Sequence, residues 1–181
     1  MLLDITERLM VRDGYAAVTS RRVAIDAGVT APLVHYYFPS LDDLFVALLR
    51  RRAEEQLTRQ ARLLAVDEPL RALWKFNVDR AAARIVAEFI GLSNHRKSVR
   101  VEFAAYAERF RAIELAALEV ALADGRIDLG GLSPAGLLVL LSTAARGLVN
   151  EESVGISTGH REVHALVEEL LTRAERTKDG S

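Results

Sequence analysis

Hydrophobic residues along this chain recur every three to four positions, and polar or glycine-containing breaks separate the resulting segments. This spacing places apolar side chains on one face of an α-helix. The segments predicted to be helical are 2–13, 20–27, 31–37, 41–64, 69–91, 98–123, 133–151 and 160–176. The segment 69–91 can also be divided into two helices near Ala81. No segment alternates apolar and polar residues for long enough to indicate a strand, so the pattern predicts an all-α protein.

Two short predicted helices, 20–27 and 31–37, carry signals at their ends. Thr19 can cap the first helix, because its hydroxyl can accept a backbone N–H bond. Gly28 follows the same helix, where a left-handed residue is favoured. Thr30 can cap the second helix in the same way. Two short helices joined by a tight turn are typical of a helix-turn-helix, whose second helix lies in the DNA major groove.

The first 45 residues resemble the DNA-binding domain of the tetracycline-repressor (TetR) family. The matching pieces are Gly14-Tyr15, Thr19-x-Arg21-x-Val23-Ala24, Ala27-Gly28-Val29-Thr30 and Tyr36-Tyr37-Phe38-Pro39-Ser40. The resemblance implies a three-helix DNA-binding domain over residues 1–45 and a helical effector-binding and dimerisation domain over 46–181. Leu41 departs from the pattern, because the family commonly has a phosphate-binding lysine there.

The motif and the resemblance together indicate which side chains contact DNA. Arginine can pair with guanine or with phosphate, and Arg21 aligns with the family's usual arginine. Val34 is expected in the core. Tyr36 and Tyr37 can each pack in the core or contact phosphate, and we expect Tyr36 in the core and Tyr37 on phosphate. The candidate DNA-binding residues are Thr19, Ser20, Arg21, Arg22, Thr30, Ala31, Pro32, Leu33, His35, Tyr36 and Tyr37.

The last two predicted helices carry extensive apolar surface. Apolar residues of 133–151 cover more than one face, which indicates burial on more than one side. The helix 160–176 has one apolar stripe, made of Val163, Leu166, Val167, Leu170, Leu171 and Ala174. Both helices can pack only on their own core, or they can form a four-helix interface with a second copy, as the resemblance implies. We favour a homodimer through 133–151 and 160–176, because paired helix-turn-helix units bind half-sites about 34–36 Å apart.

The middle helices contain most of the remaining aromatic residues, with a few polar residues among them. Aromatic residues at helical spacing usually form a core, but an apolar cavity with a few fixed polar groups is also the general form of a ligand site. The family places its effector pocket among these helices. The candidate pocket residues are Trp74, Asn77, Phe89, Phe103, Tyr106 and Arg146. Few charges lie on the apolar faces, so we expect a mostly apolar small molecule.

Composition narrows the possibilities further. The chain has 181 residues, 50% of them hydrophobic, a net charge of −1 and no cysteine. The lack of cysteine excludes disulfides and thiolate metal sites and fits a cytoplasmic protein. Charges within residues 1–40 cancel, which predicts modest non-specific DNA binding. The longest uncharged run, 129–145, contains glycines and a proline, so no membrane association is expected.

Neither catalysis nor a cofactor is indicated. The chain has no Gly-x-Ser-x-Gly motif and no phosphate-binding glycine loop. His160 and His164 share a helix face, but Glu162 is one residue late for a metalloprotease motif, so both histidines are expected on the solvated surface. His35 is expected on DNA, because no second ligand lies at metal-binding spacing. We therefore expect no metal site and no enzyme.

These patterns predict a homodimeric, ligand-responsive transcriptional regulator. The main hypothesis is a repressor that a small apolar effector releases from a palindromic operator. The first alternative is a helical DNA-binding regulator without an effector. The second is a helical-bundle enzyme that uses the motif as a scaffold, and the lack of a catalytic set of residues argues against it.

Overall fold

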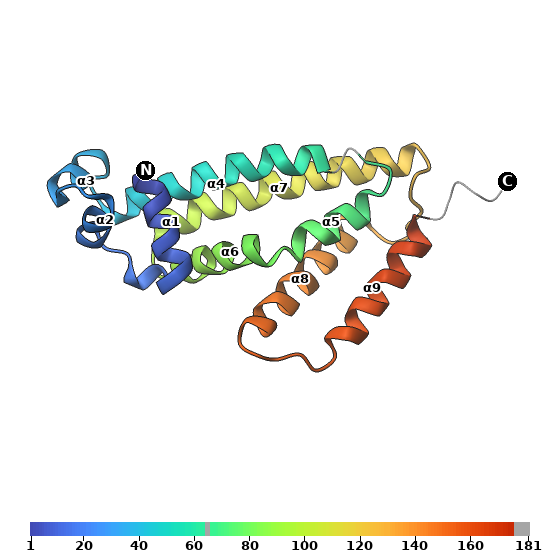
Figure 1. Ribbon diagram of the computed structural model, residues 1–181. Coiled ribbons are helices and arrows are strands. Elements are labelled where there is room, and N and C mark those ends of the chain that lie inside the picture. Colours follow the sequence, from blue (N-terminus) through green and yellow to red (C-terminus); the bar gives the residue numbers. More distant parts are fainter. Residues whose placement is uncertain (64–65, 176–181) are drawn as a thin grey trace. The chain divides into compact units, whose positions relative to one another are not determined.

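The computed structural model describes residues 1–63 and 66–175 (Figure 1). The helices are α1 (Leu2–Asp13), the 3-10 helix η1 (Tyr15–Ala17), α2 (Ser20–Ala27), α3 (Ala31–Tyr37), α4 (Leu41–Leu63), α5 (Pro69–Asn77), α6 (Arg80–Ser93), α7 (Lys97–Ala123), α8 (Pro134–Ser153) and α9 (His160–Ala174). The described residues form no strand, which confirms the all-α prediction. The segment 69–91 is divided at residues 78–79, close to the expected position. The predicted helix ends at residues 64 and 176 lie outside the described residues.

The chain forms two compact units. Unit 1 comprises Met1–Gln56 and Arg84–Ala107, and unit 2 comprises Leu57–Ala83 and Glu108–Ser181. The boundaries between them fall within α4, α6 and α7. These units describe packing, whereas the functional division at residue 45 stays a prediction.

Unit 1 has an apolar core shared by α1 to α4 and by its parts of α6 and α7. Its most enclosed side chains are Leu9, Met10, Val23, Val34, Leu44, Phe45, Leu48, Leu92 and Val99. Each large apolar side chain buried in this way contributes about 1.5–3 kcal/mol. The hydroxyl groups of Thr6 and Ser93 are also enclosed, and each donates to the carbonyl four residues earlier in its own helix, at 2.9 and 2.7 Å. The polar groups in this core are therefore satisfied locally.

Unit 2 has a second apolar core, built from α5, α7, α8 and α9. α5 packs against α8 (Figure 1) and contributes Leu70, Leu73 and Trp74. Ser133 caps α8 as its position suggests, because its Oγ accepts the N–H of Gly136 at 3.3 Å. Within the described parts of the chain, no helix is both long enough and apolar enough to cross a membrane.

Candidate functional site

α2 is terminated as the sequence predicts. The Oγ1 of Thr19 accepts the backbone N–H of Arg22 at 3.1 Å. Gly28 has a left-handed φ of 66°, and the N–H of Val29 returns to the carbonyl of Ala24 at 3.0 Å. A side chain is rarely tolerated at such a positive φ, which explains the glycine. These end contacts fix the short turn between α2 and α3.

α3 is anchored through a single buried residue. Val34 is 1% exposed, as expected. Thr30 occupies the N-cap position as expected, but its side chain does not make the capping hydrogen bond. Its carbonyl instead accepts the N–H of Leu33 at 3.1 Å. The short helix thus depends on Val34 and on its backbone for its placement.

The expectation that Tyr36 packs in the core is wrong. Its side chain is 79% exposed, and that of Tyr37 is 60% exposed. Successive helical residues are about 100° apart, so a residue two positions after buried Val34 faces away from the core. The two tyrosine rings meet edge to face, with their centroids 5.2 Å apart. Both phenols are therefore on the surface that α3 presents to solvent.

The two arginines of α2 differ in their partners. Arg22 forms an ion pair with Asp13, which also binds Arg12. These hydrogen bonds, that of Arg12 first, lower the pKa of Asp13 below its ordinary value. Arg21 is exposed and has no ion pair or hydrogen bond from its guanidinium within the described residues. Arg21 is thus the arginine of α2 that is available to a ligand.

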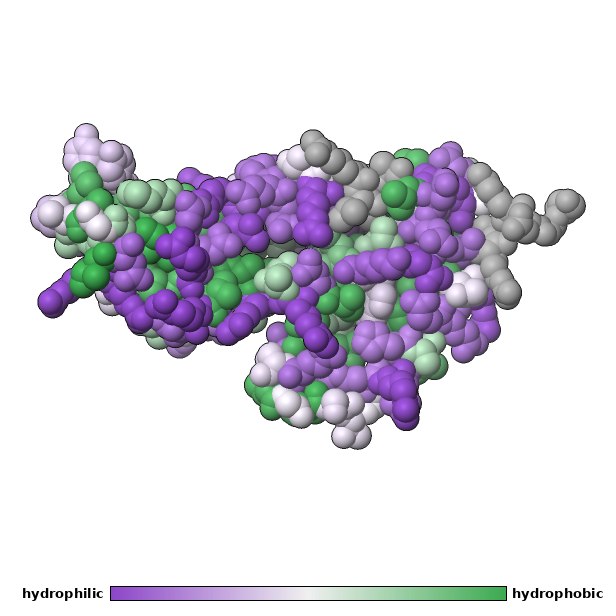
Figure 2. Space-filling view, in the orientation of Figure 1, coloured by the Kyte–Doolittle hydropathy of each residue, from purple (hydrophilic) through white to green (hydrophobic). Residues whose placement is uncertain are grey.

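The other predicted DNA-binding residues lie around this exposed surface. Thr19, Thr30, Pro32, Leu33 and His35 are exposed, and Ser20 and Ala31 are half-buried. The visible surface over α2 and α3 combines apolar and weakly polar residues (Figure 2). The structure therefore brings the predicted residues together on two consecutive helices of unit 1.

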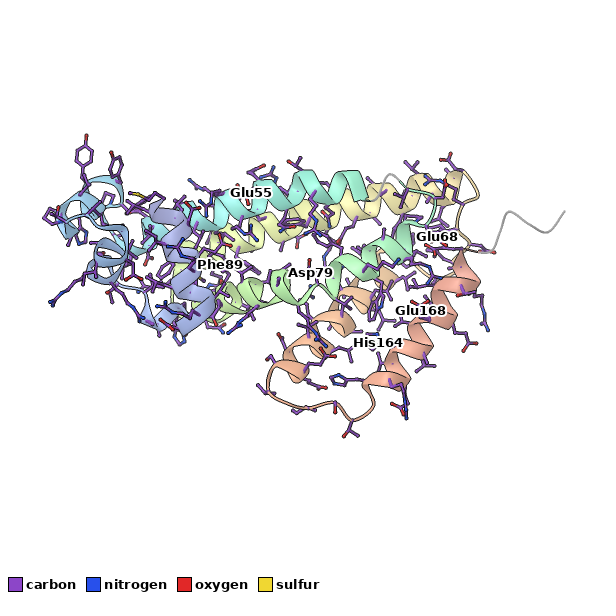
Figure 3. All side chains as sticks on the ribbon, viewed as in Figure 1. Glu55, Glu68, Asp79, Phe89, His164 and Glu168 are labelled. Carbon is purple, nitrogen blue, oxygen red and sulfur yellow. The ribbon has the colours of Figure 1, made fainter. Side chains whose placement is uncertain are left out.

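The predicted ligand residues, in contrast, are divided between the units. Trp74, Asn77 and Arg146 belong to unit 2, and Phe89, Phe103 and Tyr106 belong to unit 1. Trp74 is a core residue, 4% exposed, and so is Phe89, labelled in Figure 3, which is 2% exposed. Asn77 uses its amide within its own helix, donating to the carbonyl of Leu73 at 3.0 Å. Neither unit gathers the whole predicted set.

Unit 2 contains a buried polar pair that the sequence analysis missed. Gln60 is 1% exposed and Glu114 is 7% exposed. The Nε2 of Gln60 donates to Oε1 of Glu114 at 2.6 Å, while the Gln60 Oε1 has no partner among the described groups. Burial raises the pKa of Glu114 to about 7, although Arg111 and Arg146 act in the opposite direction. One sequence signal was present, because Glu114 stands four residues before buried Leu118 on the same helix face.

Unit 2 also has a surface hollow of about 480 Å³. It lies between the loop 128–132 and α9, and its lining includes Leu132, Leu166 and Leu170. None of the predicted ligand residues lines it. This hollow is therefore separate from the pocket that the sequence suggested.

His160 is not on the solvated surface, so that prediction is wrong. The side chain is buried at the start of α9, and its Nε2 lies 2.8 Å from Oε2 of Glu151. The turn after α8 folds the chain back, which brings the ring against carboxylates at the end of that helix. His164 (Figure 3) is half-buried and packs edge-on against Trp74, with centroids 5.7 Å apart.

The apolar stripe of α9 is divided between two environments. Val167 and Leu171 are buried in the core of unit 2, whereas Leu166 is 66% exposed. α8 likewise exposes apolar side chains, with Leu140 61% exposed and Val139 41% exposed. Both helices therefore retain an apolar surface that the rest of the described chain does not cover.

The N-terminal residues match a known protein family. Residues 2–48 match the model of the bacterial regulatory proteins of the tetR family. A comparison with curated proteins gives no match. The family match covers α2 and α3, which carry the candidate DNA-binding residues.

Solved structures resemble the chain over nearly its whole length. A transcriptional regulator from Saccharomonospora viridis in complex with choline is 21% identical, with a TM-score of 0.78 over 94% of this chain and 93% of that chain. A TetR-family regulator from Agrobacterium tumefaciens is 20% identical, with a TM-score of 0.77 over 96% and 95%. A TetR regulator from Haloarcula marismortui is 18% identical, with a TM-score of 0.75 over 97% and 95%. The fold of these regulators is thus the fold of this chain.

Proposed function

Because this chain belongs, through residues 2–48, to the tetR family of bacterial regulatory proteins, we propose that it is a homodimeric repressor. It binds an operator of approximate two-fold symmetry. Each protomer places α3 in the major groove, with Arg21 of α2 on guanine or phosphate. Tyr37 contacts phosphate, and the exposed tyrosine ring of Tyr36 lies beside it.

One observation carries the DNA-binding proposal. α2 and α3 are held together by buried Val23 and Val34, while Arg21 and the outer surface of α3 remain exposed. Arg21 is not engaged by a carboxylate of the described chain. A fixed helix pair with an uncommitted arginine is suited to bind an anionic duplex, since phosphate contacts supply most non-specific affinity.

The dimer is supported by the uncovered apolar surface of α8 and α9. Leu140 and Leu166 are large apolar residues that are mostly exposed in the protomer. A two-fold interface uses the same patch of both subunits, so these helices can cover each other's apolar surface. The resulting symmetry of two helix-turn-helix units matches the symmetry of a palindromic operator.

The repressor is released by a small, mostly apolar effector bound among the helices of residues 46–181. The regulator from Saccharomonospora viridis, which has this fold, was crystallised with choline, and this supports a ligand site in such a fold. The buried pair Gln60 and Glu114 offers buried polar groups within unit 2. The effector acts through its different affinity for the DNA-bound and free arrangements, a coupling typically worth about 1–3 kcal/mol.

The DNA that flanks the gene for this chain provides the test. An inverted repeat in that DNA should give a specific band shift with the purified protein, and a scrambled repeat of equal length serves as the control. Absence of any specific shift would contradict the proposed function. Compounds that change the fluorescence of Trp74 are then added to the complex. Loss of the shift supports an effector, whereas a shift that no bound compound weakens favours the regulator without an effector.

A further inference from the structure

Residues 88–98 of unit 1 contact the segment that leads into the helix-turn-helix. Gly14 has a φ of +82°, and this turn directs the backbone N–H of Tyr15 to Oε2 of Glu88, at 2.7 Å. The donor precedes α2 by five residues, and the acceptor is on α6. A hydrogen bond to a charged acceptor is stronger than one between neutral groups.

The ring of Tyr15 fits closely over the same helix. A Cβ atom added at Gly91 would lie 3.0 Å from Cε1 of Tyr15, which is tighter than an ordinary contact. The ring centroid of His95 lies 6.3 Å from that of Tyr15. Gly91 therefore provides the space that lets Tyr15 pack against α6.

The same short stretch contacts the segment that follows the helix-turn-helix. Asp42, in the first turn of α4, accepts hydrogen bonds from Arg96 and Ser98. These two bonds, that of Ser98 first, lower the pKa of Asp42 below its ordinary value. The guanidinium of Arg96 also lies 5.5 Å from the centre of the Phe45 ring. The end of the motif is thus held by charge, hydrogen bonding and packing together.

We propose that residues 88–98 form a bracket that positions the helix-turn-helix for DNA binding. Glu88 holds its entrance and Arg96 holds its exit, so both are positioning residues that do not touch DNA. One contact alone would let α2 and α3 pivot about it, whereas two contacts at opposite ends fix their orientation. This inference rests on the proposed DNA-binding function and adds residues outside the 2–48 match.

The test compares Glu88→Ala, Arg96→Ala and the double variant in titrations of a duplex that the wild-type protein binds. Each single variant should bind about tenfold more weakly, and the double variant more weakly still, since a lost charged hydrogen bond allows misplacement of the motif. The slope of affinity against salt concentration should stay unchanged, because no phosphate contact is removed. Arg100→Ala is the matched control, as Arg100 is exposed and has no ion pair among the described residues. Glu88→Gln should restore binding, because its amide oxygen can still accept the N–H of Tyr15.

Gly91→Ala separates positioning from general stability. Alanine is favoured over glycine within a helix, which offsets the cost of moving Tyr15, so the thermal stability of this variant should change little. Its new methyl group nevertheless displaces Tyr15, so DNA affinity should fall about fivefold or more. Wild-type affinity in both Glu88→Ala and Gly91→Ala would overturn the bracket, as would a reduced salt slope in Glu88→Ala. Failure of the wild-type protein to bind any duplex would instead overturn the proposed function itself.

Discussion

Both units of the protein bury hydroxyl groups that bond within their own helices, but among the described residues a side-chain carboxyl is classed as buried only in unit 2, at Glu114. In unit 1, the enclosed hydroxyls of Thr6 and Ser93 bond to carbonyls of their own helices. In unit 2, Glu114 depends on Gln60, which is 54 residues away in the chain. Unit 1 also forms its ion pairs near the surface, such as that of Arg50 with Glu102. A carboxyl that is enclosed and weakly compensated costs stability, so the folded chain favours the protonated form of Glu114.

The units also differ in how completely they cover their apolar residues. Unit 1 exposes Ile25, Leu33, Tyr36 and Tyr37 on α2 and α3, where DNA is proposed to bind, and also Met1, Ile90 and Val101. Unit 2 leaves Leu140 and Leu166 uncovered on two adjacent elements of the chain. Under the proposed function, the exposed apolar residues of unit 1 face DNA, whereas those of unit 2 face a second copy of the chain.

The largest expected effect follows from Leu166→Glu. The wild-type chain should sediment as a dimer at micromolar concentration, and this variant should sediment as a monomer. A buried unpaired charge costs several kcal/mol at an interface. Leu166 is 66% exposed in the protomer, so its replacement leaves the core of unit 2 intact. The control is Val154→Glu, at a position 72% exposed in the turn after α8, which should remain dimeric. A monomeric wild-type chain would refute the proposed dimer.

Glu114→Gln should change the pH dependence of stability. The pKa of Glu114 is raised by burial from 4.5 to about 7. Between pH 4.5 and about 7, Glu114 is ionised in the unfolded chain but still protonated in the folded chain. The free energy of unfolding therefore falls as the pH rises through this window. The total loss is about 3 kcal/mol.

Because the glutamine side chain cannot ionise, the variant should be more stable than the wild type at pH 8 and nearly equal to it at pH 4. Urea unfolding at a fixed protein concentration measures both values. Glu108→Gln, at an exposed position of α7, is the control and should follow the wild type. Parallel pH profiles for Glu114→Gln and the wild type would show that Glu114 ionises normally in the folded chain.

Arg21→Ala should weaken operator binding while the fold stays intact. The loss should be about 1–3 kcal/mol if Arg21 contacts a base, and less if it contacts one phosphate. If Arg21 contacts a phosphate, the slope of log affinity against log salt concentration should be smaller by about one in the variant. Arg8→Ala, which removes an exposed arginine of α1 outside the motif, is the matched control. Equal affinity of Arg21→Ala and the wild type would remove Arg21 from the interface.

The smallest effect is expected from Thr6→Val in unit 1. The side chain is fully buried, but its hydroxyl bonds only within α1. Replacement by an apolar side chain of the same shape should cost about 1 kcal/mol. Urea unfolding should therefore give a smaller change than Glu114→Gln at pH 8. A larger loss for Thr6→Val would contradict the contrast between the two units.

The sequence predicts best what depends on neighbouring residues. The cap at Thr19, the left-handed turn at Gly28 and the buried position of Val34 follow from spacing alone, and the structure confirms all three. The prediction for Tyr36 is wrong because α3 buries only Val34, so no other residue of this helix packs in the core. The prediction that His160 is solvated is wrong because the turn before α9 brings this residue against Glu151 of α8.

Contacts between distant parts of the chain were not predictable from local patterns. Glu88 bonds to Tyr15 across 73 residues, and Gln60 bonds to Glu114 across 54. Each of these side chains could equally be a solvated helix residue, since helical periodicity says nothing about which helices become neighbours. The candidate DNA-binding residues lie within one continuous motif and were therefore accessible, whereas the ligand residues come from several helices.

Selection of bound duplexes from a random DNA pool tests the central claim most directly. The protein is incubated with the pool, the bound fraction is amplified through several rounds, and the enriched duplexes are sequenced. We expect an inverted repeat whose half-sites are about 34–36 Å apart or a multiple of that distance. A pool without enrichment, or a single site without two-fold symmetry, would contradict the account of a dimeric operator-binding regulator.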